Sequence, residues 1–479
     1  ILRGSKSLKD AKSCLINGDT ENITFKTQKS KKEASKLCFT EKQASAILEM
    51  RLYRLIGLEI MALQEEYAEI LKKIDKYQDI LEQEIGKGRK ITGDYNPVHM
   101  DCLLHPEQYA PVIAAESCVS CEDERACMNS CVFDAIEGKN GEIHINAEKC
   151  TGCGECIDVC KLERITANKD VLPVIQAVRS GKKDVYVLIA PAFTGQFGEK
   201  ATPGRLRTAF KAIGFKGMVE VAVFADILTL KEALEFEHHV QKKEDFQLTS
   251  CCCPVWIAMI RKIYSELVPH VPGAVSPMIA AGRVVKELYP DAMTVFVGPC
   301  MAKKKEAREE DIADAVDYVL TFQEVQDIFD AAGIQPELLS EDEKEHSSRA
   351  GRIYARTGGV SEAVKKTVEQ IDPDKKIPVI PEQADGVPAC KKLIERIQKG
   401  ETEANFFEGM ACNGGCVGGP KIIIKKEEGK ERVDAYGDEA QYRTPLENPF
   451  VLELLERLGY DSVENFLENS KILTRDFGE

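Results

Sequence analysis

Long apolar runs and histidine are both scarce in this chain of 479 residues. No apolar run approaches the ~18–20 residues that a helix needs to span a bilayer, so the sequence predicts no membrane anchor. No signal peptide is visible, although the chain starts at Ile1 rather than at methionine. We therefore expect a cytoplasmic protein. The seven histidines have no zinc-finger spacing, which argues against structural zinc.

Positive charge is in deficit, because the formal net charge is −15. This balance argues against nucleic acid as the main partner. The deficit is uneven: residues 1–95 carry 18 Lys and Arg against 15 Asp and Glu, whereas the remaining residues carry 46 against 64. The step in charge indicates two segments of different origin. The length allows two to four domains.

Residues 1–95 have the pattern of an α-helical segment. Thr40 and Gln43 stand three apart, as in a capping box that begins a helix. Glycine costs about 1 kcal/mol inside a helix, so we expect Gly57 to mark a break. Farther on, apolar residues spaced alternately by four and three form the seam of a short coiled coil: Leu63, Tyr67, Ile70, Ile74, Tyr77 and Leu81. Because fewer than three heptads are present, we expect an antiparallel helical pair or a dimer contact.

The stretches Phe39–Leu52 and Leu55–Glu59 resemble the coiled-coil region of the A subunits of DNA gyrase and topoisomerase IV. The resemblance covers residues 1–85, about a sixth of the chain. The tyrosine-bearing cleavage domain of those enzymes has no counterpart in the sequence, so topoisomerase activity is not expected. We expect a helical appendage or a dimerising module. The alternative is a DNA-associated module, which salt-dependent DNA binding would support.

Two cysteine segments lie between residues 96 and 170. The second has the Cys-x2-Cys-x2-Cys-x3-Cys spacing of bacterial ferredoxins, and the first differs by a loop three residues longer. The first contains Cys118, Cys121, Cys127 and Cys131, and the second contains Cys150, Cys153, Cys156 and Cys160. Val132 and Lys161 stand where proline usually follows the fourth cysteine. Zinc is the alternative, but two such segments in tandem favour iron–sulfur clusters in a reducing compartment.

Each cluster is expected to take ligands from both segments, because in two-cluster ferredoxins the fourth cysteine of one motif binds the other cluster. We assign one 4Fe–4S cluster to Cys118, Cys121, Cys127 and Cys160, and the other to Cys150, Cys153, Cys156 and Cys131. Ile143 and Ile145, with polar residues between them, predict a short strand before the second segment. Residues 96–170 are thus predicted to be a ferredoxin-like domain.

Residues 171–479 alternate short apolar strands with helical stretches, which predicts an α/β fold. The predicted strands are Val185–Ile189, Val219–Val223, Phe246–Leu248 and Thr294–Val297. Several of them are followed by cysteine segments. Because α/β proteins build their sites at the carboxyl ends of parallel strands, we expect these segments to meet.

Three segments carry these further cysteines: Thr249-Ser250-Cys251-Cys252-Cys253-Pro254-Val255-Trp256, Gly298-Pro299-Cys300-Met301-Ala302-Lys303 with Glu306, and Glu408-Gly409-Met410-Ala411-Cys412-Asn413-Gly414-Gly415-Cys416. Together they resemble the three signature motifs of the FeFe hydrogenases, within residues 96–479. The third cysteine in the first segment, and Gly298 where many relatives have methionine, indicate a divergent TSCCCP subgroup.

The resemblance implies a two-lobed catalytic domain that clamps an H-cluster, which is a 4Fe–4S cluster bridged to a two-iron site with carbonyl, cyanide and dithiolate ligands. It implies reversible proton reduction and dihydrogen oxidation. Electrons would pass to or from ferredoxin, or a similar carrier, through the two other 4Fe–4S clusters. Hydrogenase maturation proteins would supply the two-iron unit.

The resemblance also implies the ligands of the H-cluster: Cys253, Cys300, Cys412 and Cys416, with Cys416 as the bridge to the two-iron site. The cysteine before the first ligand is the expected proton donor. Alignment on Pro254, which suits a first helical position, makes Cys252 the donor and Cys253 the ligand. Alignment on Thr249 and Ser250 would make them Cys251 and Cys252 instead.

Other side chains have roles implied by the same resemblance. Lys303 would pair with a cyanide ligand, with Glu306 inside the site and Met410 over the two irons, whereas Lys304 and Lys305 are expected on a solvated face. Glu232 and Glu235, which are three apart on one predicted helix face, would relay protons. The alternative is two surface carboxylates. Pro272 falls where relatives place a relay serine.

A second functional class is a non-catalytic relative used in iron–sulfur assembly or sensing. Such relatives typically lose the donor cysteine, whereas Cys252, Lys303 and Met410 are all present here. Four other cysteines, Cys14, Cys38, Cys102 and Cys390, are expected to be buried inert thiols.

Overall fold

The computed structural model divides into two compact units, residues 1–95 and residues 96–479. It describes residues 1, 4–49, 102, 105–114, 118, 125–139, 142–161, 164–249, 252–342, 344, 346–462, 465–466 and 471–477. Each unit is described by itself.

The described residues of the first unit form three short helices, α1 (Leu8–Asn17), α2 (Gln28–Ala34) and α3 (Glu41–Glu49). The capping box predicted for α3 is confirmed, since Gln43 N donates to Thr40 Oγ1 at 3.3 Å and Thr40 N donates to Gln43 Oε1 at 3.0 Å. Ala11, Leu15, Ala44 and Leu48 form its small core. The predicted seam from Leu63 to Leu81 and the break at Gly57 lie outside the described residues.

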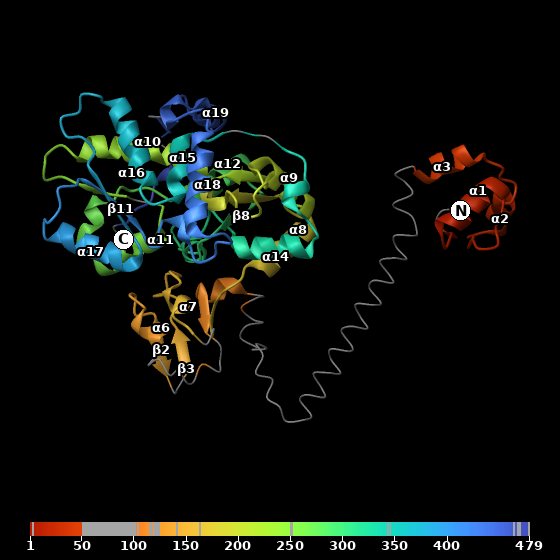
Figure 1. Ribbon diagram of the computed structural model, residues 1–479, viewed down its shortest axis with the longest axis horizontal. Helices are drawn as coiled ribbons and strands as arrows, with labels where there is room; N and C mark the ends of the chain where they lie inside the picture. Colours follow the sequence, from red (N-terminus) through yellow and green to blue (C-terminus); the bar gives the residue numbers. More distant parts are fainter. Residues whose placement is uncertain are drawn as a thin grey trace. The chain divides into compact units, whose positions relative to one another are not determined.

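A small domain of two antiparallel strand pairs begins the second unit. Strand β1 (Val112–Ala114) pairs with β4 (Ile165–Ala167), and β2 (Ile136–Lys139) pairs with β3 (Glu142–Ile145). Strand β3 is the strand predicted around Ile143 and Ile145. The short helices α6 (Ala126–Asn129) and α7 (Glu155–Asp158) carry cysteines next to these strands, and Figure 1 shows them with β2 and β3 in orange.

The first lobe of the larger domain is built on a parallel four-stranded sheet in the order β6-β5-β8-β9. Its strands are β5 (Val185–Ile189), β6 (Gly217–Glu220), β8 (Met293–Gly298) and β9 (Tyr318–Thr321). The helices around it are α8 (Val171–Ser180), α9 (Pro203–Ile213), α12 (Pro277–Leu288), α13 (Ala302–Glu306) and α14 (Phe322–Ala331). The central strands are almost wholly buried, as expected for parallel sheets covered on both faces.

The second lobe is built on a parallel three-stranded sheet in the order β10-β11-β7. Its strands are β7 (Gln247–Leu248), β10 (Pro381–Asp385) and β11 (Phe406–Met410). Its helices are α11 (Pro254–Ile263), α15 (Arg349–Arg352), α16 (Gly359–Ile371) and α17 (Val387–Gln398). Helices α18 (Lys426–Asp438) and α19 (Pro449–Arg457) follow. The α/β class with two lobes is therefore confirmed.

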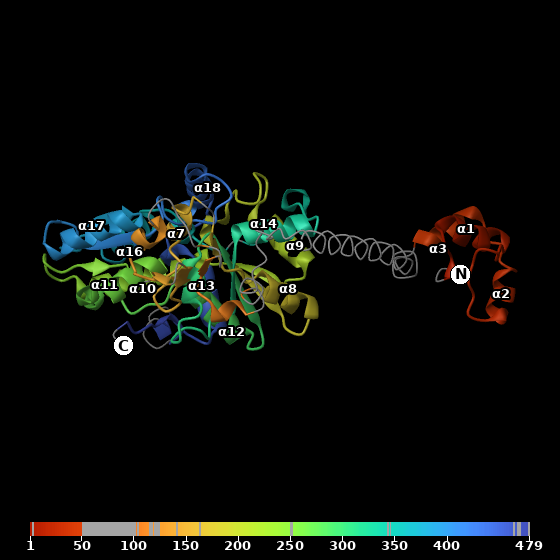
Figure 2. The same cartoon turned by 90° about the horizontal axis from the view of Figure 1, so that it is seen from below.

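Helix α10 (Ala222–His239) joins the lobes, because it contacts α12 of the first lobe and both α15 and α16 of the second. It lies beside α16 in both views (Figure 1, Figure 2). The strand predicted over Val219–Val223 is confirmed only at its start, since β6 ends at Glu220 and α10 begins at Ala222. The first twelve residues of α10 are all buried, and a helix buried on every side has the same continuous apolar pattern as a buried strand.

Candidate metal centre

Three cysteine segments begin where parallel strands end. Cys252 and Cys253 follow β7, Cys300 follows β8, and Cys412 with Cys416 follows β11. Strands β7 and β11 are neighbours in one sheet, while β8 is central in the other. The carboxyl ends of both sheets therefore bring these cysteines to the boundary between the lobes.

Helix α11 begins at Pro254 as predicted, and Cys253 is its N-cap. The sulfur of Cys253 accepts a hydrogen bond from Ala411 N at 3.4 Å, which ties the first cysteine segment to the third. Burial, followed by the nearby Cys253, raises the pKa of the Cys300 thiol to about 11. Lys303 and the backbone N–H groups of Ala302 and Lys303 oppose that rise. Such N–H groups stabilise negative charge on sulfur.

The four thiols lie close enough to influence each other. Burial raises the pKa of the Cys416 thiol to about 12, with contributions from Cys300 and Cys253, and Lys303 lowers it. The pKa of the Cys412 thiol is raised for the same reason, by burial and then by Cys300, Cys253 and Cys416. A buried set of four thiols is costly to ionise without a cation, and iron would provide that positive charge.

Two glycines let the third segment turn between its cysteines. Gly414 and Gly415 have φ values of 85° and 89°, in the region that favours glycine. A Cβ atom on Gly415 would lie 2.7 Å from Thr357 N, and Thr357 N itself donates to Gly414 O at 3.0 Å. The loop that carries Cys412 and Cys416 therefore rests on the backbone around residue 357.

The predicted donor and relay residues gather on the α10 side of the site. Cys252 packs against an apolar cluster that includes Met410, which is 1% exposed. Glu232 is also 1% exposed, and Gln247 Nε2 donates to its carboxylate at 3.2 Å, so the surface interpretation is wrong for Glu232. Glu235 is partly exposed and pairs with Lys231 and His239. Cys251 lies outside the described residues.

The three consecutive lysines have different environments. Lys303 is buried, and its Nζ donates to the buried Glu306 at 2.6 Å. Lys304 was expected on a solvated face, but that expectation is wrong because its side chain is 0% exposed. Its Nζ donates to Val319 O at 2.7 Å and pairs with Glu324 at 3.3 Å, so protein oxygens replace water around the charge. Lys305 is half-buried.

A small apolar cavity in the ferredoxin-like domain is surrounded by the four cysteines assigned to one cluster, Cys131, Cys150, Cys153 and Cys156. Phe133, Ile136 and Ile145 line it too. Burial raises the pKa of the Cys153 thiol to about 12, with Cys150 and Cys131 among the further causes. The cavity therefore offers four thiols in an apolar shell, which is the donor set that a 4Fe–4S cluster requires.

The other assigned set is described only in part. Cys127 is buried and influences Cys156, whereas Cys118 and Cys160 are half-buried. Cys121 lies outside the described residues. Of the four cysteines given no metal role, Cys14, Cys102 and Cys390 are buried as predicted. Cys38 is exposed, in the loop before α3, which contradicts its expected burial.

The ferredoxin-like domain contacts the segment of Cys300 directly. Gly152 packs so closely on α13 that a Cβ atom would lie 3.1 Å from Ala302 N, and one on Gly154 would lie 2.9 Å from Met301 Cε. Both glycines have positive φ. Cys153 is among the groups that raise the pKa of Cys412. The two cysteine sites are thus neighbours, as electron transfer between them would require.

Buried polar atoms beside the site add to the case for bound groups. Thr249 Oγ1, Trp256 Nε1 and Thr151 Oγ1 have no hydrogen-bond partner among the described residues. Within the same part of the chain, no three His, Cys, Asp or Glu side chains are placed to hold a single metal ion. An iron–sulfur cluster needs four separated thiols, N–H donors beside the sulfurs and an apolar shell. The site has all three, so its residues fit an iron–sulfur cluster.

Sequence reasoning missed several residues that hold this arrangement together. Gln247 contacts Glu232, and Ser361 N and Oγ donate to the buried Glu408 at 2.8 and 2.6 Å. Their contacts join residues far apart in the chain. The pair Gly358-Gly359, at the start of α16, was the available signal for a close turn there.

Comparison with protein families identifies two domains. Residues 183–420 match the C-terminal domain of the iron only hydrogenase large subunit. Residues 143–162 match the 4Fe–4S binding domain. Helices long and apolar enough to cross a membrane are absent from the described part of the chain.

The curated relatives have two kinds of function. The chain is 27% identical over 384 residues to the NADP-reducing hydrogenase subunit HndD of Solidesulfovibrio fructosivorans, in a match covering 68% of this chain and 66% of the relative. It is 27% identical over 308 residues to iron hydrogenase 1 of Clostridium pasteurianum, covering 54% of each protein. It is also 24% identical to the cytosolic iron-sulfur assembly component 3 of Bos taurus, covering 65% and 80%. The chain thus spans about half to two thirds of the hydrogenases named here.

The N-terminal part of the chain matches a different protein, over a short stretch of each. One subunit of the DNA gyrase of Aminobacterium colombiense is 43% identical over 81 residues, which is 17% of this chain and 8% of that protein. So small a share of the gyrase polypeptide supports no topoisomerase function.

Solved structures support the fold. The apo form of the FeFe hydrogenase of Chlamydomonas reinhardtii has a TM-score of 0.53 at 23% identity, covering 64% of this chain and 98% of that one. A structure reporting oxygen inactivation of an FeFe hydrogenase has a TM-score of 0.51 at 25% identity, covering 62% and 97%. Residues 183–420 thus form a domain of the FeFe-hydrogenase-like family, and the relatives similar to this chain include both hydrogenases and iron–sulfur assembly components.

Proposed function

We propose that the protein is an FeFe hydrogenase that reversibly reduces protons to dihydrogen. The observation that carries this proposal is the convergence of Cys253, Cys300, Cys412 and Cys416 beside the buried Lys303. Electrons would pass to or from ferredoxin, or a similar carrier, through two 4Fe–4S clusters.

The four cysteines would hold the cubane part of the H-cluster, with Cys416 as the bridge to the two-iron site. When bound, that site supplies the metals at which protons and electrons combine. The N–H groups of Ala302, Lys303 and Ala411 would stabilise the sulfur ligands. The apolar residues around Cys253 and Met410 would keep water out.

Cys252 would exchange protons with the bound group, because a thiol pKa near 8.5 is readily tuned. Glu232, which is buried on α10 and accepts a hydrogen bond from Gln247, would supply protons to the Cys252 thiol. Glu235 would connect Glu232 to the surface, because it is partly exposed. With proline at position 272, the middle of the route would need an ordered water.

Lys303 would place a buried ammonium beside anionic ligands on the iron. Glu306 accepts from it at 2.6 Å and fixes its direction. Met410, at the end of β11 next to Cys252, would cover the two-iron site.

The electron route would run through the ferredoxin-like domain. Cys153 belongs to the set assigned to one cluster and influences Cys412 of the catalytic site. The other cluster, assigned to Cys118, Cys121, Cys127 and Cys160, would accept electrons from the carrier. A reducing, cytoplasmic location would keep these thiols available for the clusters. The N-terminal helices would serve as an appendage or dimer contact.

An iron–sulfur assembly function is the second candidate, supported by the similarity to cytosolic iron-sulfur assembly component 3. Such a protein would need the clusters but neither the thiol of Cys252 nor the buried ammonium of Lys303. The presence of Cys252 together with a buried Lys303 that influences Cys300 and Cys416 favours the hydrogenase, since assembly would require neither.

The deciding experiment is an infrared spectrum of protein matured without oxygen, alongside an established FeFe hydrogenase matured in parallel. Sharp bands of metal-bound carbonyl and cyanide are expected. Their absence, with iron present and the parallel enzyme active, would contradict the hydrogenase proposal and favour iron–sulfur assembly. The control variant Cys390→Ser changes a buried thiol outside the assigned ligands and should keep the bands.

A further inference from the structure

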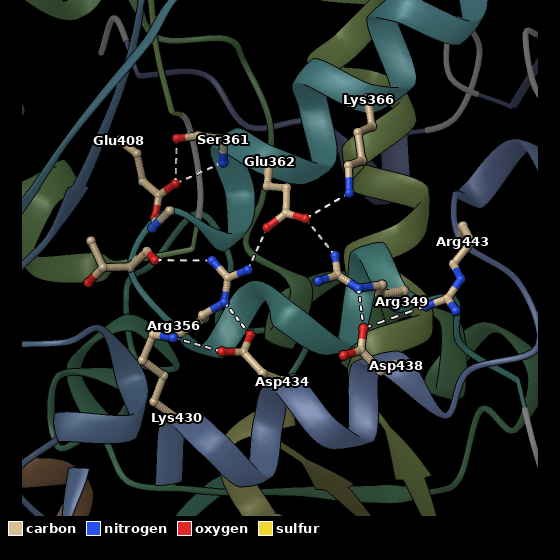
Figure 3. Close-up of polar contacts among 12 residues, drawn as sticks. Arg349, Arg356, Ser361, Glu362, Lys366, Glu408, Lys430, Asp434, Asp438 and Arg443 are labelled. Carbon is tan, nitrogen blue, oxygen red and sulfur yellow. Dashed lines mark hydrogen bonds and ion pairs between the residues drawn. The ribbon is translucent and has the colours of Figure 1, made fainter. Parts of the chain in front are cut away.

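A network of charged side chains joins α15, α16 and α18 behind the third cysteine segment (Figure 3). Glu362 is at its centre and receives hydrogen bonds from Arg349 at 2.6 Å, from Lys366 at 2.8 Å and from Arg356. Its remaining members are Lys430, Asp434, Asp438 and Arg443. Figure 3 shows the two arginines reaching the same carboxylate from opposite sides.

Arg356 connects this network to the cysteine loop. Its guanidinium pairs with Glu362 and, at 2.5 Å, with Asp434, and it is only 12% exposed. Its backbone leads directly to Thr357, whose N–H donates to Gly414 O at 3.0 Å. Arg356 C would lie 2.8 Å from a Cβ atom on Gly415, so the two backbones are in close contact.

The residues after Arg356 hold the same cysteine segment at two further points. Thr357 Oγ1 donates to Asp385 at 2.9 Å, at the end of β10, and Gly386 N donates to Met410 O at 2.9 Å. Gly358 N donates to Glu408 at 2.8 Å, as the N–H groups at the start of α16 meet a buried carboxylate of β11. The segment 356–361 thus lies between the charge network and the loop of Cys412 and Cys416.

Arg349 is a natural contrast within the network. It also pairs with Glu362, is 16% exposed and makes a second ion pair, with Asp438 at 2.9 Å. Its backbone, however, donates to Tyr442 O rather than to the cysteine loop. Two arginines of similar burial and pairing therefore differ in whether their backbone leads to the metal ligands.

We infer that Arg356 is a positioning residue for the metal centre: pinned by Glu362 and Asp434, it fixes Thr357 and Gly358 as the support on which the Cys412–Cys416 loop rests. The inference rests on the proposed binding of a cluster by those cysteines. If the network served only to stabilise the fold, losing either arginine should have the same effect. If it positions the metal centre, losing Arg356 should disturb the cysteine loop and losing Arg349 should not. Changes that loosen such supporting contacts typically weaken metal binding by about 10–100-fold.

The test compares Arg356→Gln with Arg349→Gln in the full chain carrying its clusters. The readouts are the rate of iron loss to a chelator, the electron paramagnetic resonance signal of the catalytic cluster, and the melting temperature. For Arg356→Gln we expect iron loss from the catalytic site to be about 10–100-fold faster, with an altered resonance signal. For Arg349→Gln we expect a similar fall in melting temperature with an unchanged signal and an unchanged rate.

A second variant keeps the comparison informative if Arg356→Gln fails to fold. Asp434→Asn leaves Arg356 its pair with Glu362 and should produce the same spectral change in weaker form. Equal rates of iron loss in the Arg356 and Arg349 variants, with wild-type signals in both, would overturn the inference. A wild-type protein that binds no iron at the four cysteines would instead contradict the proposed function.

Discussion

Gly409 and Trp256 occupy adjoining space, such that a Cβ atom on Gly409 would lie 2.1 Å from Cε3 of the Trp256 indole. Trp256 is 1% exposed and belongs to the first cysteine segment, while Gly409 belongs to the third. The space left by the glycine in the third segment is thus filled by the tryptophan of the first segment. This contact helps to hold Cys253 near Cys412.

Replacing Gly409 with alanine should therefore destabilise the protein by at least about 1–3 kcal/mol, because the core has no room for the methyl group. Thermal melting of the apoprotein would measure the effect. In the double variant Gly409→Ala/Trp256→Leu the smaller leucine should leave room for the methyl group. The double variant should therefore be more stable, by about 0.5–3 kcal/mol, than the sum of the two single effects predicts. Gly217→Ala is the control, since its nearest contacts would lie at 3.7 Å.

Glu232→Gln should lower the rate of hydrogen turnover by more than about tenfold, because the buried carboxylate would no longer exchange a proton with Cys252. The hydrogen bond from Gln247 would find an amide oxygen in place of the carboxylate, so the fold and the infrared bands should persist. Glu237→Gln, on the same helix, is the matched control. An unchanged rate in Glu232→Gln would remove this residue from the route.

The three consecutive lysines should respond differently to replacement by methionine. Lys304→Met should cost about 3–5 kcal/mol of stability, because it leaves Glu324 buried without its ion pair. Its carbonyl and cyanide bands should nevertheless persist. Lys303→Met should lose those bands, and the half-buried Lys305 should tolerate the change. Calorimetry and infrared spectra on the three variants would separate these outcomes, and carbonyl and cyanide bands that persist in Lys303→Met or vanish in Lys304→Met would contradict the assignment.

Asp226 should make stability depend on pH. Burial raises the pKa of its carboxyl from 3.8 to about 6, although hydrogen bonds from Ser348, Asn448 and Gly351 partly oppose the rise. Because the folded pKa exceeds the unfolded one, this contribution is complete below pH 3.8 and is lost as the pH rises through 6.

Acidification from pH 7 to pH 5 should therefore stabilise the wild type relative to Asp226→Asn by about 1 kcal/mol. Urea unfolding of both proteins at several pH values would measure the difference. A difference that does not change between these pH values would mean that the folded carboxyl titrates normally.

Local signals in the sequence predicted much of the fold. Strand β5 has the predicted bounds, and Pro254 begins its helix, because each depends on neighbouring residues. The end of the strand predicted over Val219–Val223 was wrong because the buried first residues of α10 have no polar face to reveal the helical period. The burial of Lys304 depends on Glu324 and Val319, which no spacing rule connects to it. Likewise, Arg356 meets Asp434 only through the packing of α18.

The four cysteines proposed to hold the H-cluster follow strands of two different sheets. Cys300 follows a strand of one lobe, whereas Cys253, Cys412 and Cys416 follow strands of the other. A cluster bound by all four would link the two lobes, and it could form only after both lobes have folded and come together. Removing the iron would then do more than stop chemistry, because it would free the halves to move against each other.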